Sequence, residues 1–247
     1  MEKIIGTVPG KCRKKREKAR LTLNNNPEIS WHMKKSRRTY NGVHLNKKSN
    51  TQDVVEQSLT MNDKRTNESP LLFIKDSLIG ENVKRSLKTL ADLRGVFHNC
   101  EAYEQMSPDT LLYEVTCHLP VEEGTPGGLY FGITRIYPGK VGDEYFMTKG
   151  HFHANMNRGE YYWGVEGEGR LIMMDQNRRV WSERMFPGSL HYIPGGVAHR
   201  VANIGYSVLS FAACWPSDAG HDYQVILENG FSASLQCVNG NPQLIEI

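Results

Sequence analysis

The chain has 247 residues, of which 30 are Lys or Arg and 27 are Asp or Glu, so its formal net charge is +3. This length fits one large domain, or one domain with an appendage. No apolar segment follows the basic N-terminus, and no stretch approaches the roughly 18 apolar residues of a membrane span, so we expect neither a secretory signal nor a membrane anchor.

Charge divides the chain into two regions. Residues 1–70 hold 16 Lys or Arg and 7 Asp or Glu, a net charge of +9, which leaves 14 and 20 for residues 71–247, a net charge of −6. The first region contains KCRKKREKAR and MKKSRR and has no sustained apolar periodicity. We predict a basic extension, disordered or locally helical, because too little apolar surface is available to offset the entropy of ordering. Residues 71–247 are then the folded domain.

Two other interpretations of the basic region stay open. Its charge suits an arm that binds nucleic acid or an anionic membrane surface, although Trp31 and Tyr40 are too sparse to form a base-stacking platform. Alternatively, translation starts at Met61, directly before the folded domain. Outside this region we expect no contact with nucleic acid or with a membrane.

Cysteine usage indicates a reducing compartment. The cysteines are odd in number and widely spaced, no CxxC motif is present, and their positions are Cys12, Cys100, Cys117, Cys214 and Cys237. Such a pattern is typical of reduced thiols, several of them buried. It predicts a cytoplasmic protein.

The folded domain begins with a segment of near-helical periodicity. In VKRSLKTLADLRGVF, apolar residues recur at Val83, Leu87, Leu90 and Phe97. This spacing predicts a short amphipathic helix.

From residue 111 onwards, short runs rich in aromatic and β-branched residues alternate with Gly, Pro, Asn and Asp. The runs are LLYEVTCHL (111–119), LYFGITRIY (129–137), EYYWGVEGEGRLIMMD (160–175), RRVWSERM (178–185), SLHYIPGG (189–196), HRVANIG (199–205) and SVLSFAACW (207–215). Runs of this length and spacing predict an all-β sandwich or barrel, closed or doubled to protect its edges.

The segment TKGHFHANMNRGEYYWGVEGEG (148–169) concentrates candidate metal ligands. His151 and His153 are two residues apart, so both side chains would point to the same face of a strand. The residues NMNRG (155–159) predict a turn, and Glu160 begins the returning strand. A hairpin would therefore place the Glu160 carboxylate opposite the two imidazoles.

A second segment supplies a further imidazole. Pro194, Gly195 and Gly196 predict a tight turn, after which His199 opens the next strand. Three imidazoles and one carboxylate form a nitrogen and oxygen ligand set that suits Fe, Ni, Mn, Co or Zn. Four protein ligands leave positions open for substrate if the metal is six-coordinate.

Both segments resemble the two sequence motifs of the cupins. GSLHYIPGGVAHRVAN (188–203) matches the second motif position by position, from Gly188 to Asn203. The first motif is matched by His151, His153 and Glu160, but the spacing between His153 and Glu160 is longer than in most cupins, and the upstream Gly is missing. The resemblance implies an all-β cupin barrel, a double-stranded β-helix or jelly roll, with a few short helices.

The longer spacing between His153 and Glu160 is found in one branch of the cupins. YPGKVGDEYFMTKGHFHANMNRGEYYWGVEGEG (137–169) and HRVANIGYSVLSFAACWPSDAGHDY (199–223) closely resemble the cupin-type glucose-6-phosphate isomerases of archaea and some bacteria. The resemblance implies a homodimeric, cytoplasmic, metal-dependent enzyme of glycolysis and gluconeogenesis that interconverts glucose 6-phosphate and fructose 6-phosphate. It also implies one divalent ion per subunit, with Fe²⁺ as the first expectation, held by His151, His153, Glu160 and His199.

The chemistry of such an isomerisation gives Glu160 a second role. A base removes a proton next to the carbonyl, an enediolate forms, and a cation beside O1 and O2 stabilises the developing charge. Glu160 is the best candidate base, although a carboxylate that binds a metal is a weaker base. A hydride shift between C1 and C2 is the rival mechanism, and the sequence does not choose between the two.

Other residues are candidates for substrate contacts. In the resembled family, hydroxyl groups and a backbone amide next to the HxH motif bind the phosphate, and their matches here are Thr134, Thr148, Gly150, Tyr223 and Tyr113. Lys149 adds positive potential if it is not simply solvated. Tyr162 shares the strand phase of Glu160 and could hydrogen-bond the substrate. His221 in SDAGHDY could assist ring opening or move protons near neutral pH.

Two other classes of function remain open. A cupin oxygenase needs open Fe²⁺ positions and a drier pocket than one lined by Thr, Lys and Tyr. A non-catalytic sugar-phosphate sensor would bind its ligand without turnover and contact nucleic acid through the basic region. One departure from the family, Val197 where many relatives have an aromatic residue, bears on pocket closure.

Overall fold

The structure is a computed structural model in which residues 71–247 are described, so the predictions made for residues 1–70 lie outside the described part. Its strands are β1 Leu72–Ile74, β2 Ser77–Ile79, β3 Val83–Thr89, β4 Leu111–His118, β5 Leu129–Ile136, β6 Lys140–Val141, β7 Glu144–Tyr145, β8 Glu160–Glu166, β9 Gly169–Met174, β10 Val180–Met185, β11 Leu190–Ile193, β12 Ala198–Asn203, β13 Leu209–Pro216, β14 Ala233–Val238 and β15 Asn241–Glu246. The short helices are η1 Ala91–Leu93, α2 Cys100–Glu104 and α3 Gln224–Asn229. The prediction of an all-β fold with a few short helices is confirmed.

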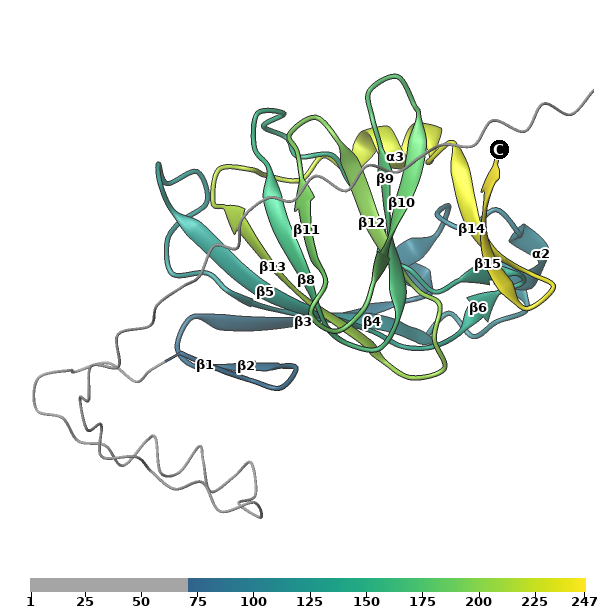
Figure 1. The fold of residues 1–247 in the computed structure, drawn as a ribbon, viewed down its shortest axis with the longest axis horizontal. Helices are drawn as coiled ribbons and strands as arrows, with labels where there is room; N and C mark the ends of the chain where they lie inside the picture. The colour runs from purple at the N-terminus through teal and green to yellow at the C-terminus, as the bar shows by residue number, and fades with distance from the viewer. Residues whose placement is uncertain (1–70) are drawn as a thin grey trace, which may run out of the picture. The chain divides into compact units, whose positions relative to one another are not determined.

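Two antiparallel sheets form the body of the fold (Figure 1). The larger has the strand order β11-β8-β13-β5-β4-β3, and the smaller has the order β10-β9-β12. Residues of both sheets line one cavity, so the sheets face each other across it. A further sheet, β15-β14-β7-β6, and the β1-β2 hairpin complete the described part.

The smaller sheet is extended by backbone pairing outside its named strands. Residues 147–151 run antiparallel to β12, with isolated bridges from Met147 to Ala202 and from His151 to His199. A third bridge joins Phe152 to Asp222. Backbone hydrogen bonds in both directions hold His151 to His199 and Phe152 to Asp222. The candidate ligand segment is therefore fixed between β12 and the chain that precedes α3.

The helix predicted around residues 83–97 is wrong for its first half. Val83–Thr89 is the strand β3, which pairs with β4 in antiparallel register, and only Ala91–Leu93 forms a helical turn. The apparent periodicity was misleading because Leu87 is 51% exposed and faces no core, whereas Leu90 and Leu93 are fully buried. Pairing with β4 satisfies the backbone of β3 and overrides the local helical pattern.

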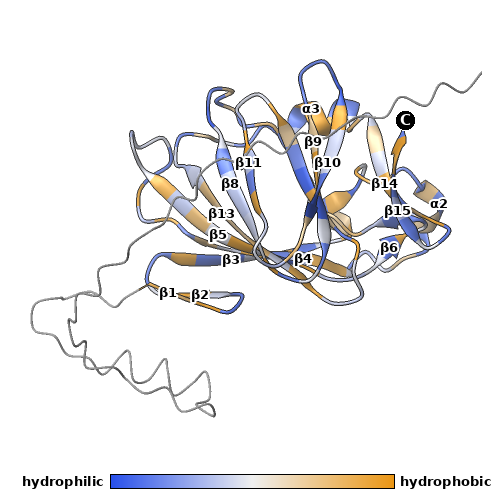
Figure 2. Ribbon diagram, viewed as in Figure 1, coloured by the Kyte–Doolittle hydropathy of each residue, from blue (hydrophilic) through white to orange (hydrophobic). Residues whose placement is uncertain are grey.

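Strand β9 lies at the centre of the core. Leu171, Ile172, Met173 and Met174 are each at most 1% exposed, so both faces of the strand are covered. The core cluster also includes side chains from α3 and β14, such as Ile226 and Leu235. By contrast, the turn between β9 and β10 is hydrophilic and lies at the surface (Figure 2). Burial of each apolar side chain of β9 contributes about 1.5–3 kcal/mol relative to leaving it exposed.

Two buried polar side chains tie separate parts of the fold together. Asn203, at the end of β12, donates through Nδ2 to the carbonyl oxygens of Ile136 and Ser207, at 2.9 and 2.8 Å. Glu144, in β7, accepts hydrogen bonds from the backbone amides of His98 and Asn99 and from the Ser234 hydroxyl. Because both side chains are at most 2% exposed, these bonds replace lost hydration and fix the packing of the segments.

The structure also bears on the sequence predictions about membrane spans and cysteines. No helix within residues 71–247 is long and apolar enough to cross a bilayer. The prediction that several cysteines are buried is wrong for the four described ones, because Cys100 is exposed and Cys117, Cys214 and Cys237 are only half-buried. Cys100 begins the helix α2, and Cys117, Cys214 and Cys237 lie near the ends of the strands β4, β13 and β14. None of the four forms a disulfide.

Candidate metal centre and substrate pocket

The structure brings together the four side chains predicted as metal ligands. His151 and His153 lie on the extended segment beside β12, Glu160 is the first residue of β8, and His199 is the second residue of β12. Each offers one ligand atom, and these atoms all lie within 4.8 Å of one another. The turn before β8 and the tight turn before β12 occur where the sequence predicts them, which is why residues far apart in the chain converge.

Hydrogen bonds behind the imidazoles orient two of them. His153 Nδ1 lies 2.7 Å from the carbonyl oxygen of Arg158, and His199 Nδ1 lies 3.1 Å from that of Val197. A carbonyl oxygen only accepts, so each Nδ1 carries the hydrogen, and each Nε2 presents a lone pair to the cluster. Metal-binding histidines are typically oriented in this way.

The inward-facing atoms themselves have no partner that satisfies them. His151 Nε2, His153 Nε2, His199 Nε2 and Glu160 Oε1 are buried and make no well-oriented hydrogen bond within residues 71–247. The Glu160 oxygen lies close to two of the nitrogens, 2.5 Å from His199 Nε2 and 3.3 Å from His153 Nε2. Unsatisfied buried polar atoms destabilise a fold. Four of them directed at one point fit a divalent cation with nitrogen and oxygen ligands.

The charge states of His151 and Glu160 also fit a cation. Burial lowers the pKa of His151 well below its usual value, and the neighbouring imidazoles lower it further. Burial alone would raise the pKa of Glu160, but His199 and His153 lower it to about 2. His151 is therefore neutral and Glu160 ionised near neutral pH, which are the forms that bind metals.

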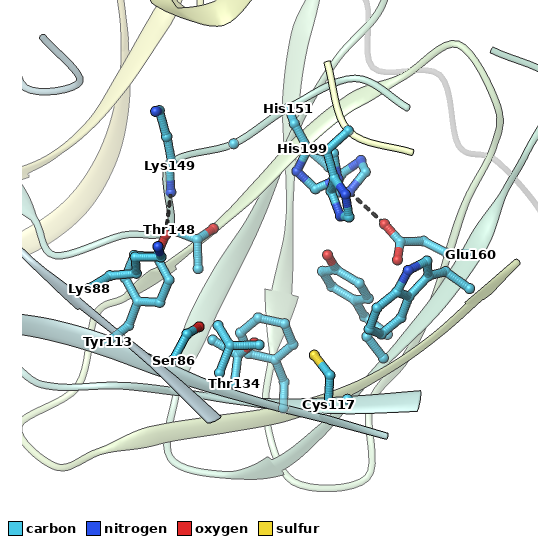
Figure 3. Close-up of a pocket in the computed structure, with 18 of the residues that line it drawn as sticks. Ser86, Lys88, Tyr113, Cys117, Thr134, Thr148, Lys149, His151, Glu160 and His199 are labelled. Carbon is cyan, nitrogen blue, oxygen red and sulfur yellow. Dashed lines mark hydrogen bonds and ion pairs between the residues drawn. The ribbon is translucent and has the colours of Figure 1, made fainter. Parts of the chain in front are cut away.

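A cavity of about 330 Å³ opens beside this cluster, a size typical of pockets for small molecules. Every predicted substrate-contact and catalytic residue lines it: Tyr113, Thr134, Thr148, Gly150, Glu160, Tyr162, His221 and Tyr223. Among the candidate ligands only His153 is absent from the lining. Figure 3 shows His151, His199 and Glu160 at one end of the pocket, and Lys88, Tyr113 and Lys149 at the other.

The tyrosines of the pocket are hydrogen-bond donors. Burial raises the pKa of Tyr162 well above its usual value, and the Glu160 carboxylate raises it further. Burial likewise raises the pKa of Tyr113. The Tyr113 hydroxyl accepts a long hydrogen bond from the backbone amide of Lys149, at 3.5 Å, so its own proton remains available. Both phenols therefore stay protonated and can donate to a ligand.

Gly150 has no room for a side chain. Its φ of +80° is unfavourable for other residues, and a Cβ atom would lie 2.9 Å from the Phe231 ring and 3.1 Å from Arg200 Cβ. Arg200 stacks on Phe231 directly behind this position, with its guanidinium 4.0 Å from the ring centroid. The backbone between Thr148 and His151 is thus held in one path. Thr148 contributes to this, because its Oγ1 accepts from the Val201 amide at 3.1 Å.

His221 and Tyr223 cover the His151 end of the pocket. Their rings stack at 5.7 Å with an interplanar angle of 5°, and the His221 ring lies 4.5 Å from that of His151. Burial lowers the pKa of His221. Lys149 Nζ lies 5.2 Å from the Tyr223 ring centroid. Since His221 touches the pocket and is neutral near pH 7, it can accept or release a proton there.

Several lining residues were not predicted from the sequence. They are Ser86, Lys88, Val115, Cys117, Gly132, Phe211, Ala213 and Trp215. Strand pairing would have found three of them, because Val115 pairs with Thr134, Ser86 pairs with Val115, and Lys88 pairs with Tyr113. The expectation of a helix over β3 concealed this register.

The fold and the site together define a cupin-type β barrel whose interior holds a candidate metal centre of three histidines and one glutamate. Comparison with known proteins narrows this class. The sequence matches the glucose-6-phosphate isomerase (GPI) family over residues 87–244, and the chain belongs to that family.

Named relatives agree with this assignment. The chain is 40% identical to the glucose-6-phosphate isomerase of Thermococcus litoralis over 162 residues, which cover 65% of this chain and 84% of that protein. It is 38% identical to the Pyrococcus furiosus glucose-6-phosphate isomerase over 168 residues, or 67% and 88% of the two chains. A putative glucose-6-phosphate isomerase 2 of Rhizobium meliloti is 36% identical over 159 residues, or 63% and 78%.

Solved structures resemble the chain only distantly. A Bacillus subtilis oxalate decarboxylase aligns with a TM-score of 0.35 and 20% identity, over 48% of this chain and 29% of the other. An oxalate oxidase in complex with glycolate aligns with a TM-score of 0.35 and 13% identity, over 59% and 56%. Likeness at this level carries no argument about chemistry.

Proposed function

We propose that this protein is a metal-dependent aldose–ketose isomerase that interconverts glucose 6-phosphate and fructose 6-phosphate. The observation that carries the proposal is the convergence of three imidazoles and a carboxylate on one point at the edge of a pocket lined with hydroxyl groups. Membership of the glucose-6-phosphate isomerase family supports the same substrates and a place in glycolysis or gluconeogenesis.

His151, His153, Glu160 and His199 would hold one divalent ion, for which Fe²⁺ is our first expectation and Ni, Mn, Co or Zn are alternatives. Bound by this set, a divalent cation supplies positive charge where negative charge develops on the substrate oxygens. The Nδ1 hydrogen bonds of His153 and His199 hold both rings in position before any ligand arrives.

Glu160 is the proposed base that moves the proton between C1 and C2. It is 5% exposed and lies at the pocket wall, where a bound substrate would contact its carboxylate. Its low pKa keeps it ionised, at the expense of base strength. Tyr162 lies in the same strand phase and donates a hydrogen bond to a substrate oxygen or to the carboxylate. A hydride shift without a protein base remains the rival mechanism.

His221 is proposed to act on the ring form of the sugar. Its imidazole touches the pocket, lies beside His151 and is neutral near pH 7. It can therefore take a proton from the anomeric hydroxyl as the ring opens. Stacking on Tyr223 keeps the imidazole in place.

The phosphate is proposed to lie at the end of the pocket away from Glu160. The Tyr113 and Thr148 hydroxyls lie there (Figure 3), and the other candidate donors, the Thr134 and Tyr223 hydroxyls and the Gly150 backbone amide, line the same pocket. Within residues 71–247 the Tyr113 and Thr148 hydroxyls each accept one hydrogen bond, so each keeps its own proton for a phosphate oxygen. Lys149 beside them adds positive charge.

We further propose a cytoplasmic homodimer. Tyr161 and Leu190 are 48% and 66% exposed, and Tyr192, 57% exposed, packs against Tyr161 at 5.2 Å. These side chains lie on paired strands, β8 and β11, and form one apolar face outside the barrel. A second copy of the chain is the proposed occupant of this face, and cross-linking with sedimentation analysis tests it.

A coupled assay tests the proposed activity. The protein is given fructose 6-phosphate, and the glucose 6-phosphate that it forms is detected with an NADP-linked dehydrogenase. The assay is run before chelation, after chelation and after addition of each metal. We expect turnover that chelation abolishes and a divalent ion restores. Oxygen uptake without isomerisation would instead indicate an oxygenase. Ligand binding without any turnover would indicate a sensor.

A further inference from the structure

One cation of the pocket has no role in the chemistry described so far. Lys88 lies on β3, its side chain is half-buried, and it lines the cavity beside Tyr113 (Figure 3). The pairing of β3 with β4 shifts register between Lys88 and Thr89. Such a bulge re-aims the adjacent side chain. The irregularity falls at the residue whose side chain reaches the pocket.

Lys88 also makes no ion pair with a described residue. Within residues 71–247 no carboxylate lies within 4.0 Å of its ammonium group. Asp92 is the nearby acid, and its carboxylate accepts instead from the Thr89 amide, at 2.8 Å, and from the Thr89 hydroxyl. Lys149, the second lysine of the lining, lies over the Tyr223 ring rather than beside an acid.

The charges of the pocket are therefore divided between its two ends. Glu160 is the only acidic residue among the lining side chains of the described chain, and it belongs to the candidate metal cluster. Lys88 and Lys149 lie at the other end, together with the Ser86, Tyr113 and Thr148 hydroxyls. Within residues 71–247 neither partly buried ammonium group has a carboxylate within 4.0 Å, so an anionic ligand would stabilise both. Two of them match a dianion.

We infer that Lys88 binds the phosphoryl group of the substrate, together with Lys149, and thereby selects phosphorylated sugars over free ones. The inference rests on the proposed function for the identity of the sugar and adds the residue that supplies the charge recognition. Hydroxyl and amide donors alone bind a phosphate without balancing its charge. A charge-assisted hydrogen bond is roughly twice as strong as a neutral one.

The test separates binding from turnover. The probes are 1,5-anhydroglucitol 6-phosphate, which cannot isomerise, and inorganic phosphate, both titrated calorimetrically into the metal-loaded enzyme. The variants are Lys88→Met and Lys88→Arg. Lys84→Met is the matched control, because Lys84 lies on the same strand in the same phase but outside the pocket lining. Melting temperatures confirm that each variant is folded.

We expect Lys88→Met to weaken both probes by about 10- to 100-fold, the range for a lost hydrogen bond from a charged group. Lys88→Arg should retain most of the affinity, and Lys84→Met should match the wild type. In the isomerase assay, Lys88→Met should raise KM by a similar factor and leave kcat nearly unchanged, because the reacting carbons lie at the other end of the pocket.

Two results would overturn the inference. One is equal affinity of folded Lys88→Met and wild type for the phosphorylated probe, and the other is no binding of that probe by the wild type. Failure of the proposed function has a different signature. The wild type would then bind the probe, and Lys88→Met would weaken it, but no variant would convert fructose 6-phosphate.

Discussion

Replacing Glu144 tests whether one buried carboxylate holds three parts of the fold together. Its Oε1 accepts from the His98 amide at 2.6 Å and the Asn99 amide at 3.2 Å. Its Oε2 accepts from the Ser234 hydroxyl at 2.7 Å and lies 3.1 Å from His98 Nδ1. Glu144 is 2% exposed and Ser234 is fully buried. The residue thus joins β7, the start of α2 and β14.

The two available substitutions have different effects. Glu144→Ala leaves the buried Ser234 hydroxyl and two part-buried amides without an acceptor, and an unsatisfied buried donor costs about 1–3 kcal/mol. We expect a loss of about 3–5 kcal/mol, or about 6–20 °C in melting temperature for a domain of this size. Glu144→Gln keeps one oxygen for the two amides, and Ser234 can turn to accept from the new NH₂. Its loss should be only about 1–2 kcal/mol.

The pH dependence provides an independent check. Burial raises the pKa of Glu144, but the hydrogen bonds from Ser234 and His98 lower it by more, so the pKa in the folded state lies below the usual 4.5. A carboxyl with a depressed pKa contributes stability that is present above the unfolded-state pKa and is lost as pH falls through the folded-state value. The stability difference between wild type and Glu144→Gln should therefore shrink as the pH falls below 4.5.

Urea denaturation followed by tryptophan fluorescence, at pH 7 and at a series of acidic pH values, measures these differences. The candidate metal site serves as a control, because Glu144 does not line the pocket and the folded variants should keep the metal content of the wild type. A Glu144→Ala protein within about 0.5 kcal/mol of wild type would refute the reasoning, since surface substitutions give changes of that size. A wild-type to Gln difference that is constant with pH would refute the charge assignment.

The other predictions concern the site and the basic region. His151→Ala and His199→Ala should lose the bound metal and most activity while staying folded, and wild-type metal content by elemental analysis in both variants would exclude the ligand assignment. Glu160→Gln should keep some metal, but its turnover should fall by at least about 10²–10⁴-fold, the factor that general base catalysis supplies. If Glu160 transfers the proton, the product formed by the wild-type enzyme in deuterated water should carry deuterium at C1 or C2. A hydride shift predicts little deuterium in the product. Deleting residues 1–60 should leave turnover near wild type, and a soluble but inactive truncated protein would contradict this.

The sequence predicted those parts of the site that local chemistry determines. Turn residues before Glu160 and before His199 located the starts of β8 and β12 to within a residue. The two-residue spacing of His151 and His153 then predicted that they share a face. The matched spacing of the second segment added His199. Because these signals are local, the four ligand candidates could be named without knowing the strand order.

The parts that the sequence did not predict depend on pairing between distant segments. VKRSLKT has no turn residue or alternation that distinguishes a strand from a helix, and only the hydrogen bonds to β4 decide the matter. The pairs β6 with β7 and β14 with β15 were not predicted either, because β6 and β7 have two residues each and β15 contains Pro242. Ser86 and Lys88 escaped notice for the same reason as β3.

The position of β3 in its sheet has a consequence for how substrate preference can change. Among the described strands, β3 is an edge that pairs only with β4, whereas β8 has β11 and β13 on its two sides. The backbone of an edge strand can shift by a fraction of an ångström while straining one set of hydrogen bonds, but an internal strand strains two. The fold therefore tolerates substitutions at Ser86 and Lys88 more easily than substitutions near Glu160. One end of this pocket can diversify over evolutionary time, or in a directed library, while the end with the candidate metal ligands stays constant.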